Sequence, residues 1–332
     1  MTILQSDSIG WQGQRLIKKS ARTQDFLHYY TRKRILVTGG AGFLGSNLIR
    51  LLNDVDCKII CLRREEADVR SPATWRRILD GVDVVFHFAA QTSIPLAEKD
   101  PPADYTINAL PLLHLAETCR EMGLSPDVLF TGTVTETGIP MRLPVDETHP
   151  DHPVTIYDLH KWLAEQYLKH FVKRGILRGA ILRLANVYGP GPQTQSPDRG
   201  VLNQMIRKAL AGETLAIYDP LGDKLRDYIF VEDAALAFLK AGAYMEEVNG
   251  RHFVIGSGEG HTIAEAFHLV ADQISLITGR EVEVRHSPPP SPPSPIEMRN
   301  FVADFHSFSK ITGWIPQTSL KEGIAKTIRA FL

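Results

Sequence analysis

The chain has 332 residues, 43% of them hydrophobic and 23% charged, and its formal net charge is −1. This composition is typical of a globular protein with a large core, and the length indicates about two domains. The near-zero charge gives no electrostatic reason to expect nucleic acid or an anionic membrane as partner. No apolar run is long enough to span a bilayer, and the first residues lack the apolar stretch of a signal peptide.

The three cysteines, Cys57, Cys61 and Cys119, are too few and too dispersed for a disulfide framework or a zinc site. We therefore expect buried thiols, no metal, and a location in the reducing cytoplasm. Residues 1–33 precede the first clear element and are expected to form an N-terminal extension. The basic part of this extension, 14–34, forms either an amphipathic arm on its own domain or a neighbouring subunit, or a solvated leader.

The first strong motif is RILVTGGAGFLG, residues 34–45. A buried strand runs into a glycine-rich turn, and a helix is expected over 46–53. In this context glycines allow close approach of the backbone to a pyrophosphate, and the helix N-terminus offers free N–H groups. The sequence therefore predicts a dinucleotide site on the turn, which includes the residues Gly39, Gly42, Phe43, Leu44 and Gly45.

Strand and helix patterns alternate from this motif onward. Strands are expected at 58–62, 82–88, 127–130 and 179–184, and helices at 74–79, 103–122 and 155–174. Residues 131–138 are expected to form a loop. The alternation predicts a Rossmann-type, doubly wound parallel α/β sheet with ligands beyond the carboxyl ends of its strands.

The pattern changes past residue 190, so we expect a dinucleotide-binding domain over 34–190 and a smaller α/β substrate-binding lobe over 191–332. Within this lobe, helices are expected at 201–211, 232–246 and 262–278, and strands near 215–218 and at 252–255. The segment SPPPSPPSP, 287–295, is expected to be extended, because proline excludes helix and central strand. It is interpreted as a stiff loop beside the substrate pocket, with a proline-rich ligand for a partner as the alternative.

The second candidate motif is Tyr157-Asp158-Leu159-His160-Lys161. A spacing of four residues places Tyr157 and Lys161 on one helix face, and a nearby ammonium group favours the phenolate of a tyrosine. Such a pair could move a proton at a sugar hydroxyl while a nicotinamide exchanges hydride. Taken alone, a Tyr/Lys pair at this spacing more often lies on a solvent-exposed helix face than in an active site.

With the glycine turn, the pair resembles the extended short-chain dehydrogenase/reductase family, specifically its NAD(P)-dependent nucleotide-sugar epimerases, dehydratases and ketoreductases. The resemblance covers about 34–330. Its motifs are TGGAGFLG, DVR at 68–70, HFAAQ at 87–91, Asn108, VDETHP at 145–150, YDLHK, LRLANVYGPG at 182–191, RDYIFVED at 226–233, and RNFVAD at 299–304 followed by GW at 313–314.

The resemblance implies roles for single residues. Tyr157 would be the catalytic acid/base, Lys161 its partner and a ligand of the nicotinamide ribose, and Thr133 the hydroxyl that binds the reacting oxygen. Thr131 and Thr135, two residues away on either side, are the alternatives for that role. Further cofactor contacts would come from Asp68, Val69, Ala89, Ala90 and Gln91, with Asn108 in support. The substrate diphosphate would be held by Asn186, Arg226 and Arg299, since guanidinium groups bind phosphates bidentately.

Two departures from the family pattern are informative. Relatives that prefer NAD usually carry an acidic residue after the second strand, whereas Arg63 and Arg64 stand eighteen and nineteen residues after Gly45. We therefore predict NADP(H) in preference to NAD(H), although Glu65 and Glu66 follow at once. Relatives that dehydrate carry Asp-Glu after the catalytic threonine.

This chain has Val134 and Thr135 at the Asp-Glu positions, which argues against dehydration, because valine transfers no proton. Glu136 could act as a base only in a loop shifted by one residue. His87 is expected to be a core histidine, and His160, turned away from Lys161, has no expected catalytic role.

The function expected is epimerisation at C4 of a nucleotide-diphosphate sugar through a 4-keto intermediate. The alternative is an NADPH-dependent 4-ketoreductase, and Arg63 favours it. A decarboxylase or dehydratase, or a non-catalytic dinucleotide sensor, fits less well. The resemblance also implies a homodimer built from helices 103–122 and 155–174, through apolar residues such as Leu112, Leu113, Leu163 and Leu168.

Overall fold

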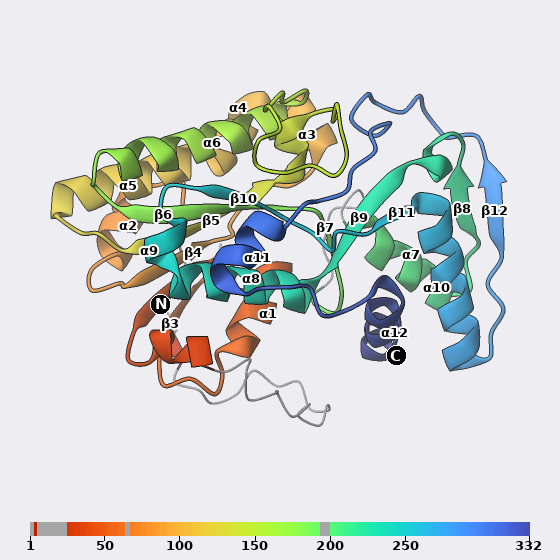
Figure 1. Cartoon of the computed structure of the whole chain (residues 1–332), viewed down its shortest axis with the longest axis horizontal. Coiled ribbons are helices and arrows are strands. Elements are labelled where there is room, and N and C mark those ends of the chain that lie inside the picture. Colours follow the sequence, from red (N-terminus) through yellow and green to blue (C-terminus); the bar gives the residue numbers. More distant parts are fainter. Residues whose placement is uncertain (1–2, 5–24, 64–66, 193–199) are drawn as a thin grey trace.

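The main body of the protein is a seven-stranded sheet between two layers of helices (Figure 1). The computed structural model describes residues 3–4, 25–63, 67–192 and 200–332. The strand order is β1-β3-β2-β4-β5-β6-β10, and all strands run parallel except β1, which is antiparallel to β3. The strands are β1 (Ile3–Leu4), β2 (Arg34–Thr38), β3 (Lys58–Leu62), β4 (Val84–His87), β5 (Asp127–Thr133), β6 (Arg178–Leu184) and β10 (His252–Ile255). This confirms the doubly wound α/β fold.

Each face of the sheet packs against its own apolar layer. The central strands are buried on both faces, so their apolar side chains point into both layers. One face is covered by the 3₁₀-helix η2 (Asp25–Tyr30), α1 (Phe43–Leu51) and α8 (Val231–Ala243). The other face carries α2 (Pro72–Ile78), α5 (Leu110–Met122) and α6 (Ile156–Lys173), with α3 (Ile94–Lys99) and α4 (Pro101–Asn108) packed on α6.

The prediction of one helix over 103–122 is wrong, since α4 ends at Asn108 and α5 begins at Leu110. The reason is Pro111, which stands in the first turn of α5. A proline has no N–H to donate, and its ring clashes with the carbonyl four residues earlier, so a helix cannot continue through it.

From β7, which begins at Asn186 and so before the expected boundary at 190, the chain alternates between the smaller lobe and the main body. The lobe contains the sheet β11-β9-β7 and the pair β12-β8, covered by three helices with a core of their own. These elements are β7 (Asn186–Tyr188), α7 (Val201–Leu210), β8 (Leu215–Tyr218), η4 (Leu221–Asp223), β9 (Leu225–Phe230), β11 (Gly260–Thr262), α10 (Ile263–Thr278), β12 (Val284–Ser287) and α12 (Leu320–Phe331). In contrast, α8, β10 and α11 (His306–Thr312) pack on the main body.

One further expectation for this part of the chain needs correction. A single helix over 232–246 is wrong, because the backbone leaves helical dihedrals at Tyr244, between α8 and α9 (Met245–Val248). The proline-rich segment begins as strand, since Ser287 ends β12 and pairs with Tyr218. Residues 288–294 then form neither helix nor strand, as the prolines require.

The last turn of the N-terminal extension is built into the fold. Tyr30 is fully buried, and its hydroxyl donates to the carbonyl of Leu239 in α8 at 2.6 Å. The absence of a side chain at Gly242 leaves room for this hydroxyl, because a Cβ there would collide with it. Residues 25–30 are therefore no solvated leader, whereas 5–24, which hold most of the expected arm, lie outside the described residues.

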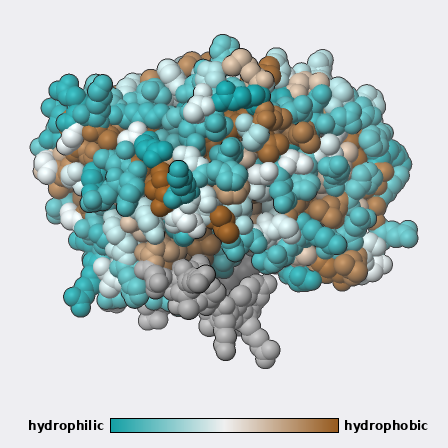
Figure 2. Space-filling model, in the orientation of Figure 1, coloured by the Kyte–Doolittle hydropathy of each residue, from teal (hydrophilic) through white to brown (hydrophobic). Residues whose placement is uncertain are grey.

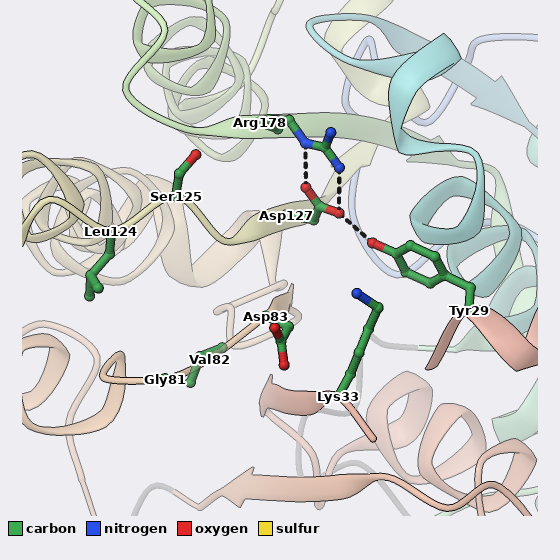
Figure 3. A pocket seen from close by; sticks show the side chains of 9 residues that line it. All are labelled: Tyr29, Lys33, Gly81, Val82, Asp83, Leu124, Ser125, Asp127 and Arg178. Carbon is green, nitrogen blue, oxygen red and sulfur yellow. Dashed lines mark hydrogen bonds and ion pairs between the residues drawn. The ribbon is translucent and has the colours of Figure 1, made fainter. Parts of the chain in front are cut away.

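Tyr29 joins a charged cluster at the amino ends of β5 and β6. Figure 3 shows its hydroxyl pointing at Asp127, whose carboxylate also accepts two hydrogen bonds from Arg178, at 2.7 and 3.0 Å. The Lys33 ammonium lies 4.3 Å from the Tyr29 ring centroid. These groups line an open hollow of about 490 Å³, which lies at the sheet edge opposite the glycine turn.

Across the described part of the chain, no helix combines the length and the apolar character needed to cross a bilayer. Figure 2 shows one face of the molecule, on which small groups of apolar residues are scattered among hydrophilic ones.

Replacing Tyr30 by phenylalanine removes the hydroxyl that anchors η2 to α8. We expect the free energy of unfolding to fall by about 1 kcal/mol, the usual net value of one buried hydrogen bond. Urea denaturation measures this change. Tyr218→Phe, at an exposed tyrosine, is the control and should leave stability unchanged. Equal stability of wild type and Tyr30→Phe would contradict the anchoring role.

Candidate active site

The glycine turn between β2 and α1 is too tight for side chains. The Gly42 N–H donates to the Gly39 carbonyl at 2.9 Å, and a Cβ on Gly45 would collide with that carbonyl. Gly39 has a φ of +66°, and a Cβ on it would lie 2.9 Å from the Ala89 nitrogen. The turn therefore packs directly against the end of β4, and only glycine fits at these positions.

Helix α1 begins at Phe43, and no side chain caps its first turn. The N–H groups at the start of a helix have no partner within the helix, and they attract anions together with the helix dipole. Phe43 and Leu44 are half-buried at this N-terminus. The glycine turn and this uncapped helix therefore fit a dinucleotide pyrophosphate.

The ends of β2 and β4 are joined by the buried hydroxyl of Thr38. It lies 2.8 Å from His87 Nδ1 and accepts hydrogen bonds from the N–H groups of Phe88 and Ala89, each at 3.1 Å. Burial, and then the positive charge of Lys161, lower the pKa of His87 to about 3. His87 is thus a neutral core histidine, as predicted.

The segment after β4 is held by side chains of α4. Ala89, Ala90 and Gln91 are half-buried there. The Gln91 N–H donates to Asn108 Oδ1 at 3.1 Å, and Asn108 Nδ2 donates to the Gln91 carbonyl at 2.8 Å. Asn108 thus supports the segment, as the resemblance implies.

Asp104, which the sequence reasoning missed, completes this support. Its buried carboxylate accepts from Gln91 Nε2 at 2.7 Å and from Asn108 Nδ2 at 2.8 Å. Its second oxygen lies 2.7 Å from Nδ1 of His160, which accounts for that histidine without a catalytic role. The spacing of four residues between Asp104 and Asn108 was the available signal.

The region after β3 is described only in part. Arg63 is exposed directly after the strand, whereas Arg64, Glu65 and Glu66 lie outside the described residues. Asp68 forms an ion pair with Arg70 at 2.6 Å. Val69 is buried, and its carbonyl accepts from the Trp75 indole at 2.8 Å.

Helix α6 carries Tyr157 and Lys161 at its start, one turn apart, and both are buried. The Lys161 ammonium lies 4.1 Å from the centroid of the Phe130 ring in β5. Because α6 packs against β5 and the turn after it, both residues lie near the carboxyl end of β5. Tyr157 and Lys161 therefore lie in the protein interior at the carboxyl end of β5, and they do not form a solvent-exposed helix face.

Thr133 ends β5, so the expected loop over 131–138 is wrong. The strand continues because Thr131, Gly132 and Thr133 pair with β6 up to Leu184. The 3₁₀-helix η3 (Val134–Thr137) follows, and a capping box forms its N-terminus. The Thr133 hydroxyl accepts a hydrogen bond from the N–H of Glu136, the third residue of η3, and the Glu136 carboxylate accepts from the Thr133 N–H at 2.8 Å. The T-x-x-E spacing was the readable signal for this turn.

Glu136 faces a buried arginine. Arg183 of β6 is 1% exposed, and its guanidinium contacts three carboxylates, those of Glu136 at 3.1 Å, Asp151 at 2.5 Å and Glu165 at 2.7 Å. Burial raises the pKa of Glu136, and the neighbouring Glu165 charge raises it further. At Glu165, burial raises the pKa, but Arg183, together with the charges of His252 and Lys169, lowers it to about 2. Glu136 is thus a structural partner of Arg183, and the unshifted turn gives it no role as a base.

The three residues expected at the substrate diphosphate come together in the smaller lobe. Asn186 lies in β7, and its side chain donates to the Asp227 carbonyl of β9 at 3.0 Å. Arg226 of β9 donates to backbone carbonyls, including those of Glu297, at 2.6 Å, and of Arg299. Both arginines are buried.

The two guanidinium groups have only backbone carbonyls as hydrogen-bond partners among the described residues, and Arg299 Nε has none. Burial lowers the pKa of both, and the charge of Arg226 further lowers that of Arg299, to about 10. Two buried cations without a carboxylate in contact are costly unless an anion joins them. The pair therefore fits a phosphate-bearing ligand.

Comparison with known proteins decides the family. Residues 35–256 match the model of the NAD dependent epimerase/dehydratase family. The chain belongs to this family. The UDP-glucose 4-epimerase of Mycolicibacterium smegmatis is 31% identical over 319 residues, which cover 90% of this chain and 98% of that protein.

Solved structures of two family members are also similar. A UDP-glucose 4-epimerase of Thermotoga maritima, with UDP-glucose, is 30% identical with a TM-score of 0.80, and the match covers 90% of this chain and 98% of that one. A UDP-glucose 4-epimerase of Thermus thermophilus, in complex with NAD, is 29% identical with a TM-score of 0.78 and the same coverage. The chain is thus an enzyme of the NAD(P)-dependent epimerase type, as the resemblance implied.

Replacing Arg183 by methionine leaves three carboxylates without their buried cation. We expect the free energy of unfolding at neutral pH to fall by about 3–5 kcal/mol, the usual cost of breaking a buried ion pair from one side. Uncompensated buried carboxylates have raised folded-state pKa values, so the deficit should shrink as the pH falls towards about 4.3.

Urea denaturation at several pH values measures both effects. Arg285→Met is the matched control, because Arg285 is exposed and pairs only with the exposed Glu283. A deficit no larger than that of the control would contradict the role of Arg183.

Proposed function

We propose that the protein is a nucleotide-sugar 4-epimerase that acts through a 4-keto intermediate. The observation that carries this proposal is the buried Tyr157/Lys161 pair, placed beside the threonine turn at the sheet edge that also holds the glycine turn. The relatives near 30% identity are UDP-glucose 4-epimerases, which favours an epimerase over a 4-ketoreductase and a UDP-sugar as substrate.

The residues expected to hold the dinucleotide lie along the glycine turn and the segment after β4. The turn would place the pyrophosphate at the N–H groups of Phe43 and Leu44, and Lys161 would bind the nicotinamide ribose. When bound, the dinucleotide supplies hydride transfer at C4 of the sugar. Its adenine would lie beside Asp68 and Val69.

The chain's own residues position the sugar and move its proton. Arg226, Arg299 and Asn186 bind the diphosphate, which directs the sugar towards α6. Tyr157 takes the proton from O4, because an adjacent ammonium group favours the phenolate, and Thr133 binds the same oxygen. After the 4-keto sugar has turned its other face, Tyr157 returns the proton to O4.

The smaller lobe contributes Arg226, and we assign the main substrate role to residues 191–332, which include Arg299, and the dinucleotide role to 34–190. We also propose a homodimer through α4, α5 and α6. Leu113 and Leu163 are half-buried and available for it, whereas Leu112 and Leu168 are fully buried within the chain. The three free cysteines fit a cytoplasmic enzyme.

Replacing Tyr157 by phenylalanine removes the proton-transferring group and keeps the ring. We expect kcat for interconversion of UDP-glucose and its C4 epimer to fall by about 100-fold or more. Cofactor affinity should change by less than about threefold, since the phenol acts on the sugar. Coupled assay of the epimer and cofactor titration measure these values. Tyr167→Phe on the same helix is the matched control, and a Tyr157→Phe enzyme as active as this control would refute the proposal.

We propose further that the enzyme prefers NADP(H) to NAD(H), because Arg63 follows β3, where a guanidinium group can pair with a 2′-phosphate. The structure of the Thermus thermophilus relative is a complex with NAD, so the cofactor preference of this chain has to be measured by direct binding of both dinucleotides. Arg63→Asp should lower NADPH affinity by about 10-fold or more and spare NADH. Fluorescence titration measures both. Arg77→Asp, the same charge change on α2, is the control, and a wild type that prefers NADH would overturn the assignment.

A further inference from the structure

Asp227, a fully buried residue of β9, carries a carboxylate that the proposed reaction does not use. One carboxylate oxygen accepts from the Ser257 N–H at 2.7 Å and from the Ser257 hydroxyl at 2.8 Å. The other oxygen accepts from the N–H groups of Gly258 and Ala303, each at 3.0 Å. Burial raises the pKa of Asp227, and these hydrogen bonds act against it, because they favour the ionised form.

The donors to this carboxylate come from two other parts of the chain. Ser257 and Gly258 lie in the connection between β10, which belongs to the main sheet, and β11 of the smaller lobe (Figure 1). Ala303 lies four residues after Arg299, one of the two arginines expected at the substrate diphosphate. The Asp227 carboxylate therefore joins a strand of the smaller lobe, the end of a strand of the main body and the stretch that carries Arg299.

Residues 297–303, called the arginine segment below, are bound to β9 at neighbouring positions. The Arg226 guanidinium donates to two backbone carbonyls of this segment. The Leu225 carbonyl accepts from the Phe301 N–H at 3.2 Å, and the Leu225 N–H donates to the Asn300 side chain at 2.9 Å. Together with the Asp227 carboxylate, three consecutive residues of β9 thus hold the arginine segment.

These contacts fix the arginine segment from more than one side. Successive side chains of a strand point to opposite faces, so Arg226 and Asp227 hold the segment on the two faces of β9. Strand β7 pairs with β9 only from Tyr228 onward, which leaves the edge at Leu225 for the segment to cross. The arginine segment therefore has a defined position on β9, and so has the backbone of Arg299 relative to that of Arg226.

We propose that Asp227 is a positioning residue for the substrate diphosphate, because it holds the arginine segment on β9 and so sets the place of Arg299 relative to Arg226. Two guanidinium groups bind phosphates bidentately only when their separation matches the anion. A carboxylate in direct contact with a diphosphate would repel it, so Asp227 acts through Arg299. This inference rests on the proposed function and adds a determinant of substrate affinity outside the set of groups that contact the substrate.

The first test neutralises the carboxylate. In Asp227→Asn one oxygen is replaced by a nitrogen that only donates, so two of the donors lose their acceptor. We expect the Kd of UDP and the KM of UDP-glucose to rise about 10-fold or more, with kcat within about threefold, since Tyr157 is unchanged. Calorimetric titration of UDP into the full chain and the epimer assay measure these values.

The matched control for this substitution is Asp233→Asn. Asp233 is also a buried aspartate, and its carboxylate accepts from the backbone N–H of Thr318 at 3.0 Å, away from the arginine segment. We expect this variant to keep the UDP affinity of the wild type within about threefold, even where its stability falls. Thermal melting verifies the fold of each variant.

The second test asks whether Asp227 acts through Arg299. Arg299→Met removes the guanidinium, and adding Asp227→Asn should then weaken UDP binding by less than about a further threefold, because no guanidinium is left to misplace. Ser257→Ala is the milder variant, since it removes one hydroxyl donor from the same carboxylate and keeps all backbone donors. We expect it to weaken UDP binding about threefold.

The outcomes separate this inference from the proposed function. A wild type that binds UDP but interconverts no C4 epimers refutes the function alone, and UDP titration of the variants still decides the inference. The inference is overturned if Asp227→Asn binds UDP as Asp233→Asn does, or if it costs a further 10-fold in the Arg299→Met background. If Asp227→Asn does not fold, unchanged UDP affinity in Ser257→Ala overturns it. A loss in Asp227→Asn that disappears without the Arg299 guanidinium supports it.

Discussion

The geometry of the candidate active site depends on the buried guanidinium of Arg183. Through Glu136 it holds the turn that carries Thr133, and through Glu165 it holds the helix that carries Tyr157. One planar group therefore sets the relative position of a strand end and a helix start. Buried ion pairs add little net stability, since their desolvation offsets their attraction. Its contribution here is the placement of the two candidate catalytic side chains, because an apolar cluster of similar volume would offer less directional restraint.

The site combines two kinds of buried charge. Arg183 is surrounded by carboxylates and belongs to the framework, whereas Arg226 and Arg299 contact only backbone carbonyls among the described residues. The second kind is costly in the free protein and is compensated when an anion is bound. This contrast separates a structural arginine from the two for which we propose a ligand, although all three are buried.

Local sequence signals predicted most of the fold. Apolar strands such as Ile35–Val37 and the glycine turn have short-range causes, so the parallel sheet and the placement of Thr133, Tyr157 and Lys161 at its carboxyl edge followed from the pattern. Two errors had local signals that were overlooked, namely Pro111 for the helix break and the capping box for the threonine turn. The contacts of Arg183 and Asp227 could not be predicted, because they join segments far apart in sequence. The cofactor preference stays a prediction, since residues 64–66 lie outside the described chain.

The path of the chain between the two bodies limits how this enzyme can be recombined with its relatives. The smaller lobe is assembled from three separate stretches, β7 to β9, β11 to β12, and α12, and the intervening α8, β10 and α11 return to the main body (Figure 1). The smaller lobe therefore cannot be exchanged as one contiguous segment. A chimera that exchanges the whole smaller lobe would need three simultaneous exchanges, with five junctions matched to the same parent.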